Sequence, residues 1–129
     1  MDVWEKLETS RVAVLATVNP DGSPHLVPVV YALVGERIVT AVDGKPKSTA
    51  RLRRLNNLDA NPSVCLLVHH YEEKWDRLWW ARIDGRATVV AADPEALSAL
   101  RKRYRQYETV ALAGPVISIE VSAVRSWPT

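Results

Sequence analysis

Apolar and polar residues alternate along most of this chain, or apolar residues gather in short runs, and both patterns are typical of β-strands. Turn sequences separate the runs, as in Asn-Pro-Asp-Gly at residues 19–22. The pattern predicts six strands, at residues 11–18, 24–33, 37–42, 64–71, 78–91 and 116–125. Strands joined by short turns, with helices outside them, indicate a small antiparallel barrel of mainly β structure, in a single domain spanning residues 1–129.

Helical spacing of apolar residues is confined to three segments. The first spans residues 2–10, the second begins at Ser48 and ends near residues 56–57, and the third begins at the capping pair Asp93-Pro94. The third helix carries four cations, which we expect to form a solvated face: Arg101, Lys102, Arg103 and Arg105.

The strand at residues 24–33 is apolar on both of its faces. Its alternating side chains form two largely apolar sets, Val27, Val29 and Tyr31 in one, and Leu26, Val30 and Ala32 in the other. Pro28 has no N–H to donate, so the strand ladder is interrupted there. Only one set can fill a small barrel, and we therefore expect either a ligand or a second subunit to cover the other.

The strand at residues 78–91 has an apolar face and a face of alternating arginine and aspartate, and it begins with an unusual cluster of tryptophans. Three of the five tryptophans in the chain fall within six residues: Trp75, Trp79 and Trp80. Trp79 belongs to the apolar face and is expected in the core. For Trp80, among the charges, a planar ligand, a second subunit and ordinary packing all remain open.

A basic cluster follows the strand at residues 37–42. Between residues 44 and 58 the sequence has no acid and five cations, Lys45, Lys47, Arg51, Arg53 and Arg54. The cluster combines a strand end, a loop containing Gly and Pro, and the start of a helix. Together these elements place free backbone N–H groups and the positive end of a helix dipole beside two lysines. This arrangement predicts a phosphate-binding corner.

The expected helix from Ser48 sharpens this hypothesis. Its spacing places Arg51 on the stripe of Leu52, Leu55 and Leu58, which must face the core. A guanidinium on the buried side needs an anion, because an unpaired buried charge costs several kcal/mol. The alternative is that Arg51 pairs with a carboxylate of the protein and that the other cations are solvated.

Composition narrows the function classes. The net charge is only +2, so the basic cluster is a local feature and nucleic-acid binding is not expected. The single cysteine, Cys65, lies in an apolar run and is expected as a buried thiol in a reducing compartment. No apolar run is long enough to span a membrane and no signal-peptide core is present, so we expect a cytoplasmic protein without a membrane partner.

Neither a metal site nor a catalytic side chain is evident. His69 and His70 are adjacent on a strand, so their rings point to opposite faces and cannot ligate one metal ion. Catalytic triads and paired carboxylates are also missing from the pattern. We expect no metal, and the catalytic residues stay unknown.

Several motifs, read together, resemble a known family. They are Val-Asp-Gly-Lys-Pro-Lys-Ser at residues 42–48, Leu-Asn-Asn at 55–57, Asn-Pro-Ser-Val at 61–64, His-Tyr-Glu-Glu-Lys-Trp-Asp-Arg-Leu-Trp-Trp-Ala-Arg at 70–82 and Asp-Gly-Arg-Ala at 84–87. The chain resembles the flavin/deazaflavin-dependent oxidoreductases of the pyridoxamine 5′-phosphate oxidase-like superfamily, in the coenzyme F420-dependent branch. The resemblance spans nearly the whole chain.

The resemblance implies a split β-barrel and a homodimer with two cofactor sites at its interface. The residues that it implies for the cofactor ring are Val27, Pro28, Val29, Val30, Thr40, Ala41 and Val42. Those that it implies for the phosphate, or for the phospholactyl-glutamate tail, are Lys45, Pro46, Lys47, Ser48 and Arg51. It also places Trp79 and Trp80 in the segment that reaches the ring.

The expected function is hydride transfer between coenzyme F420 and a small organic substrate. In such an enzyme the cofactor carries the chemistry, while the protein supplies orientation and charge. The pyridoxamine phosphate oxidases have an Arg-Lys pair where this chain has Lys-Pro-Lys, which argues against their substrate. The alternatives are an FMN-dependent oxidoreductase of the same fold and a non-catalytic flavin- or tetrapyrrole-binding protein.

Overall fold

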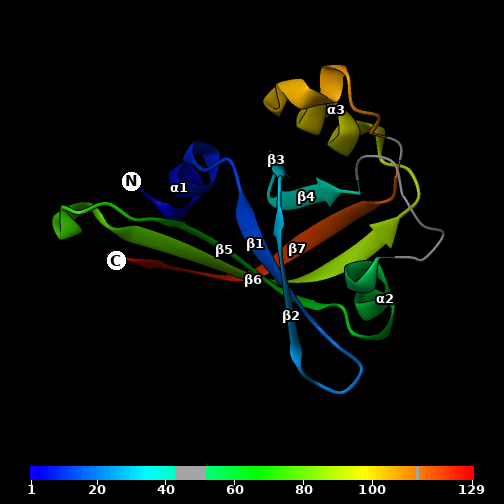
Figure 1. Cartoon of the computed structure of the whole chain (residues 1–129), viewed down its shortest axis with the longest axis horizontal. Helices are drawn as coiled ribbons and strands as arrows, with labels where there is room; N and C mark the ends of the chain where they lie inside the picture. Colours follow the sequence, from blue (N-terminus) through cyan, green and yellow to red (C-terminus); the bar gives the residue numbers. More distant parts are fainter. Residues whose placement is uncertain (43–51, 113) are drawn as a thin grey trace.

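A computed structural model describes residues 1–42, 52–112 and 114–129 of the chain (Figure 1). The strands span Ala13–Val18 (β1), Pro24–Val29 (β2), Ala32–Val34 (β3), Arg37–Ala41 (β4), Ser63–His70 (β5), Trp79–Val90 (β6) and Val116–Trp127 (β7). The α-helices span Val3–Thr9 (α1), Arg53–Ala60 (α2) and Pro94–Arg103 (α3), and two short 3-10 helices span Trp75–Arg77 (η1) and Arg105–Glu108 (η2). None of the helices in these ranges is long and apolar enough to cross a membrane.

The strands form one antiparallel sheet in the order β2-β1-β5-β6-β7-β4-β3. The long strands β6 and β7 pair along almost their whole length, from Trp80 opposite Trp127 to Val90 opposite Val116. The chain passes directly from β2 to β3, the two outermost strands, so the ends of the sheet curve around a common core (Figure 1). The predicted mainly β split barrel with peripheral helices is therefore confirmed.

The stretch expected as a single strand at residues 24–33 is divided into β2 and β3. At the bend, the carbonyl of Val30 accepts a hydrogen bond from the Thr40 hydroxyl at 2.7 Å. The N–H of Tyr31 donates to the Tyr104 hydroxyl at 3.1 Å. Side chains thus satisfy the backbone groups that a continuous strand ladder would have used, and the described residues form seven strands where six were predicted.

The first and third helices begin where their capping residues predict. The carboxylate of Asp2 accepts the N–H of Glu5 at 2.9 Å at the start of α1. At the start of α3, the carboxylate of Asp93 accepts the N–H of Ala96 at 3.1 Å. Asp93 also forms an ion pair with Arg37 of β4 at 2.8 Å, which holds its carboxyl pKa below the usual value. One carboxylate therefore both caps α3 and ties it to the sheet.

The second helix begins later than predicted. Leu52 has an extended backbone and acts as the N-cap, because its carbonyl accepts the N–H groups of Leu55 and Asn56. Leu52 is 39% exposed, whereas Leu55 and Leu58 are buried as expected. The prediction that Leu52 faces the core was wrong. Leu52 precedes the helix, so helical spacing does not determine the direction of its side chain. Ser48 and Arg51 lie outside the described residues.

Arg103, which was expected in solvent, is partly buried at the C-terminal end of α1. Its side chain is only 12% exposed. It donates hydrogen bonds to the carbonyls of Leu7 at 3.2 Å and Glu8 at 3.3 Å, and to that of Ser10, all at the C-terminal end of α1. A helix C-terminus offers unpaired carbonyls and a negative dipole end, so the guanidinium has its partners there without a buried carboxylate.

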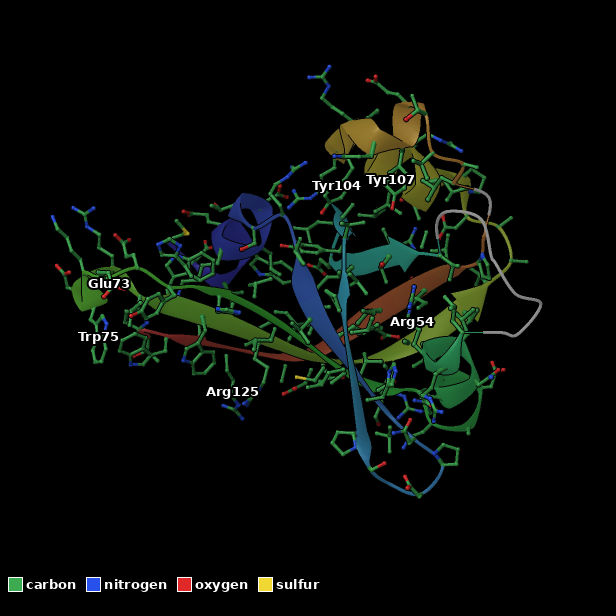
Figure 2. The ribbon with its side chains drawn as sticks, viewed as in Figure 1. Arg54, Glu73, Trp75, Tyr104, Tyr107 and Arg125 are labelled. Atoms are coloured by element: carbon green, nitrogen blue, oxygen red, sulfur yellow. The ribbon has the colours of Figure 1, made fainter. Side chains whose placement is uncertain are left out.

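Tyr104 completes this contact beneath α3 (Figure 2). Its hydroxyl accepts from Arg103 Nε at 3.1 Å and lies within donating distance of the carbonyls of Tyr31, at 2.8 Å, and Arg11, at 3.0 Å. The Arg103 guanidinium lies 5.0 Å from the ring centre of Tyr31, whose hydroxyl donates to Leu7. Burial raises the pKa of Tyr31 to about 12. The cluster joins α1, α3 and the β2–β3 bend into one unit.

The predicted faces of β6 are correct. Ala81, Ile83 and Ala87 on the apolar face are buried, while Arg82 and Arg86 lie on the other face. The pairing with β7 shifts by a bulge at Asp84 and Gly85. A Cβ at residue 85 would lie 2.5 Å from the carbonyl oxygen of Glu120, so only glycine fits this close approach.

Candidate functional site

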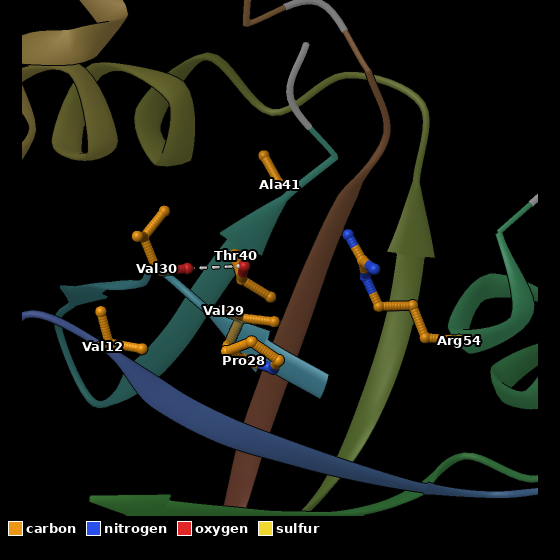
Figure 3. Close-up of a pocket in the computed structure, with 7 residues that line it drawn as sticks. All are labelled: Val12, Pro28, Val29, Val30, Thr40, Ala41 and Arg54. Carbon is orange, nitrogen blue, oxygen red and sulfur yellow. Dashed lines mark hydrogen bonds between the residues drawn. The ribbon is translucent and has the colours of Figure 1, made fainter. Parts of the chain in front are cut away.

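A cavity of about 240 Å³ lies at the bend between β2 and β3, beside the end of β4 (Figure 3). Its walls come from four separated parts of the chain, and its lining residues are Val12, Pro28, Val29, Val30, Thr40, Ala41 and Arg54. Five of these are among the residues that the sequence singled out for a cofactor ring. The fold therefore brings Pro28, Val29 and Val30 together with Thr40 and Ala41.

The strands make this wall rigid. Thr40 is 2% exposed, and its hydroxyl is held by the Val30 carbonyl, so the β4 wall and the β2 wall are bonded to each other. Among the described strands β2 pairs only with β1, so its other edge has no neighbour within this part of the chain. Pro28 removes one N–H from the strand, as is usual for proline on edge strands. Pro28, Val29 and Val30 thus bring apolar side chains to a cavity whose surface also has a large polar share.

Arg54 brings positive charge to the cavity. It is the second residue of α2, and its side chain reaches from that helix toward the cavity (Figure 3). The start of a helix also carries a partial positive charge and unpaired N–H groups. An anionic group bound beside the apolar wall would therefore find a guanidinium and a helix start on the same side.

A buried amide fixes the position of α2. Asn57 is 1% exposed and donates to the Thr17 hydroxyl at 3.0 Å and to the side-chain carbonyl of Asn19 at 3.0 Å. Arg53 reaches the same Asn19 oxygen at 3.5 Å. These bonds anchor α2 to β1 and to the turn after it, one helical turn away from Arg54.

The remaining residues predicted for the site fall into three groups. Val27 and Val42 are partly buried against the core and do not line the cavity. Five others lie outside the described residues, namely Lys45, Pro46, Lys47, Ser48 and Arg51. The third group, Trp79 and Trp80, lies elsewhere on the sheet. The basic cluster nevertheless begins four residues after the cavity residue Ala41 and ends at the cavity residue Arg54.

Trp79 and Trp80 lie at the far end of β6, beside a surface hollow of about 420 Å³. Trp79 stacks on His70 with 5.9 Å between ring centres. The ammonium of Lys6, which is buried, lies 5.8 Å from the Trp79 ring centre and donates to the Trp127 carbonyl at 3.4 Å. Within one chain, the structure does not bring the two tryptophans to the cavity at the β2–β3 bend.

Trp80 also borders the outer face, the apolar surface of β2, β1, β5 and β6 that points away from the core. A hollow of about 510 Å³ lies on it, lined by Val14, Ala16, Leu26, Cys65, Leu67, His69, Trp80 and Arg82. Leu26 is 65% exposed. Figure 2 shows Trp75 and Arg125 on the side of the sheet opposite α1. An exposed apolar face of this kind typically marks an interaction surface.

Cys65 on the outer face is half-buried rather than fully buried as expected. Burial raises the pKa of its thiol to about 11, so it is protonated near neutral pH and is a poor nucleophile. Among the described residues, no group of His, Cys, Asp and Glu side chains is arranged to hold a metal ion.

Sequence reasoning missed Val12 and Arg54 as cavity residues. Val12 precedes β1 and has no local feature that sets it apart. Arg54 was recognised in the basic cluster but was not among the residues predicted to hold the cofactor. In the structure it is the second residue of α2 and lines the cavity.

Residues 3–128 match the family model described as pyridoxamine 5′-phosphate oxidase. The chain belongs to this family. No curated protein matches the sequence.

Members of several bacterial groups share the fold. A conserved hypothetical protein from Mycobacterium tuberculosis is 27% identical, with 98% of this chain and 84% of that chain covered and a TM-score of 0.74. A FAD-binding protein from Mesorhizobium loti is 23% identical, with 96% and 90% covered and a TM-score of 0.71. HutZ, the heme storage protein from Vibrio cholerae, is 15% identical, with 95% and 90% covered and a TM-score of 0.73.

Proposed function

We propose that this member of the pyridoxamine 5′-phosphate oxidase family binds coenzyme F420 at the β2–β3 bend and transfers hydride between it and a small organic substrate. The observation that supports this most is the cavity itself. It combines apolar side chains from Pro28, Val29 and Val30 with a hydroxyl from Thr40 and a cation from Arg54. A ring with an anionic tail needs both kinds of surface.

The protein's part in the reaction is to bind, orient and exclude water. A bound deazaflavin supplies a ring carbon that donates or accepts hydride. Val29 and Val30 would contact the bound ring, and the Thr40–Val30 hydrogen bond holds that side of the cavity in place. Arg54 and the start of α2 provide positive potential for the tail.

The size of the cavity favours a site completed by a second copy of the chain. Ligand pockets usually have a volume of about 300–1,000 Å³, whereas the described part of one chain encloses about 240 Å³. The outer face of the sheet offers an apolar surface for such a copy, with Leu26 exposed and Trp80 half-buried. In the proposed homodimer, the segment with Trp79 and Trp80 reaches the cofactor of the partner subunit.

The choice of F420 over FMN rests on charge. The sequence between Ala41 and Arg54, which both line the cavity, contains Lys45, Lys47 and Arg51. FMN has one phosphate, whereas F420 has a phosphodiester followed by several carboxylates. Each exposed ion contact contributes about 0.2–1 kcal/mol and is screened by salt. We expect F420 to bind more tightly than FMN, with an advantage that shrinks as the salt concentration rises.

Binding isotherms for both cofactors, followed by tryptophan fluorescence at low and near-molar salt, test this proposal. Lys47→Ala should weaken F420 binding by about 1.5–3 kcal/mol, the range for a charge-assisted hydrogen bond. Lys74→Ala is the matched control, because it removes an equal charge from an exposed position at the far hairpin. Equal affinities, or an FMN preference that does not respond to salt, would make this an FMN protein.

Non-catalytic tetrapyrrole binding is the other alternative, since a heme storage protein shares the fold. Heme iron in proteins is held by His, Cys, Met or Tyr. None of the described lining residues of the cavity is of these types, which favours a flavin-type ring. Titration with heme should therefore give no saturable Soret shift.

A further inference from the structure

A second, smaller cavity adjoins the proposed cofactor site. It has a volume of about 160 Å³ and is lined by Val30, Tyr104, Gln106, Tyr107 and Val110. Val30 also lines the first cavity, so the two cavities share one lining residue. We infer that this second cavity is a substrate subsite for an uncharged, single-ring compound with one hydrogen-bonding group. That the bound compound is a substrate rests on the function proposed above.

The volume sets the size of the ligand. An apolar cavity of about 150 Å³ is known to take up benzene, so a cavity of about 160 Å³ suits one six-membered ring. The walls are suited to a ring as well. Tyr104 and Tyr107 are 5% and 8% exposed and meet edge to face, with 6.2 Å between ring centres. Arg11 and Arg103 lie over the Tyr104 ring, at 4.6 and 5.5 Å from its centre, so the pair offers the ligand an aromatic wall through the parts of the two rings that line the cavity.

The polar groups of the wall set the chemistry of the ligand. The Tyr104 hydroxyl is fully engaged by Arg103 and by backbone groups of residues 11 and 31. It therefore has no proton to offer a ligand. Gln106 contributes an amide, which can both donate and accept. No charged side chain is among the described lining residues, and a charged ligand would lose its hydration without compensation.

The two cavities are also held in a fixed relation. Val42, next to the cavity residue Ala41, donates its N–H to the Pro115 carbonyl at 3.0 Å. A Cβ at Gly114 would lie 2.3 Å from the Val42 carbonyl oxygen, so the backbones can touch only because this residue is glycine. The segment after η2, which supplies Val110, is thereby attached to the strand end that borders the cofactor site.

Titration of the purified, isotopically labelled protein with phenol, followed by amide chemical shifts, tests the inference. Phenol should bind saturably and shift the amides of Gln106, Tyr107 and Val110. Benzoate, with the same ring and a charge, should bind at least tenfold more weakly, and the two-ring compound 1-naphthol should also bind more weakly. Equal binding of phenol and benzoate, or shifts confined to another region, would overturn the inference.

Three variants sharpen the test. Val110 is 40% exposed, so Val110→Trp can fill the cavity without disturbing the core, and it should abolish phenol binding. Gln106→Ala should weaken phenol binding roughly threefold to tenfold, the equivalent of one hydrogen bond. Arg105→Ala, on the same short helix but outside the cavity, is the control and should change nothing. Undiminished phenol binding in both cavity variants would refute the assignment. If Val110→Trp does not fold, the result for Gln106→Ala decides the question.

Cofactor titrations separate this inference from the proposed function. Saturating F420 should leave the phenol affinity within twofold, because the cavities are adjacent and distinct. Displacement of one by the other would mean a single shared site and would overturn the inference. A protein that binds phenol with this profile but neither F420 nor FMN would retain the ring subsite and lose the proposed function.

Discussion

The burial of Arg103 predicts a large and specific loss of stability when it is replaced by alanine. The guanidinium donates to three carbonyls at the end of α1 and stacks near Tyr31 and Tyr104, at 5.0 and 5.5 Å from their ring centres. A hydrogen bond from a charged donor contributes about 1.5–3 kcal/mol, and a cation–π contact about 0.5–2 kcal/mol.

These contributions do not add in full. Burying the guanidinium costs several kcal/mol in lost hydration, which offsets part of the gain. The ion pair with Glu8, at 3.5 Å and with the Glu8 side chain 61% exposed, adds little. We therefore expect Arg103→Ala to lower the free energy of unfolding by about 3 kcal/mol. Arg103→Lys should lose roughly half as much, because an ammonium cannot reach three carbonyls in a planar fork.

Urea unfolding followed by tryptophan fluorescence measures the effect. With a dependence of about 1–3 kcal/mol per molar urea, typical of small proteins, the midpoint should fall by roughly 1–3 M. Lys102→Ala is the control, since its side chain is exposed on the same helix and should change the stability by less than about 0.5 kcal/mol. If Arg103→Ala unfolds at the same urea concentration as this control, the buried cluster does not stabilise the fold.

Three further predictions concern pH, assembly and backbone packing. Burial raises the pKa of Tyr31 from 10.0 to about 12, so between these pH values the folded protein keeps a proton that the unfolded chain releases. The free energy of unfolding should therefore fall by up to about 2.7 kcal/mol from pH 10 to 12. Tyr31→Phe should remove this pH dependence. The proposed dimer should bury over ~1,000 Å², and Leu26→Asp should convert it into a folded monomer, as measured by sedimentation. A wild-type protein that is monomeric at low micromolar concentration would contradict the proposed assembly. Gly85→Ala should lower the unfolding free energy by about 1–3 kcal/mol in urea titrations, because the new methyl group meets the Glu120 carbonyl.

The alternation of apolar and polar residues predicted the strands well, because it reflects which face of each strand is buried. The alternation along β6 placed Ala81 and Ile83 in the core and Arg82 outside it, and the structure agrees. The capping residues Asp2 and Asp93 marked two helix starts correctly, since an N-cap acts within three residues of itself.

The features that were missed depend on residues distant in sequence. The bend at Val30 and Tyr31 requires hydroxyls from Thr40 and Tyr104, and nothing within the stretch itself announces it. Arg103 was assigned to solvent because its neighbours are cations, and its carbonyl partners lie more than ninety residues earlier. For the proposed cofactor site, the resemblance supplied five residues that line the cavity, but the contribution of Arg54 became evident only from the structure.

The position of β7 within the sheet has a consequence for the order of folding. This strand, the last described, lies between β6 and β4, so among the described strands the β3–β4 hairpin is hydrogen-bonded into the sheet through β7 alone. During synthesis one edge of β6 and the β3–β4 hairpin therefore remain without their β7 partner until residues 116–127 have left the ribosome. Most of the stabilising pairings connect residues far apart in sequence, which favours slow folding. The interval before β7 pairs is when the nascent chain is most exposed to aggregation through open strand edges.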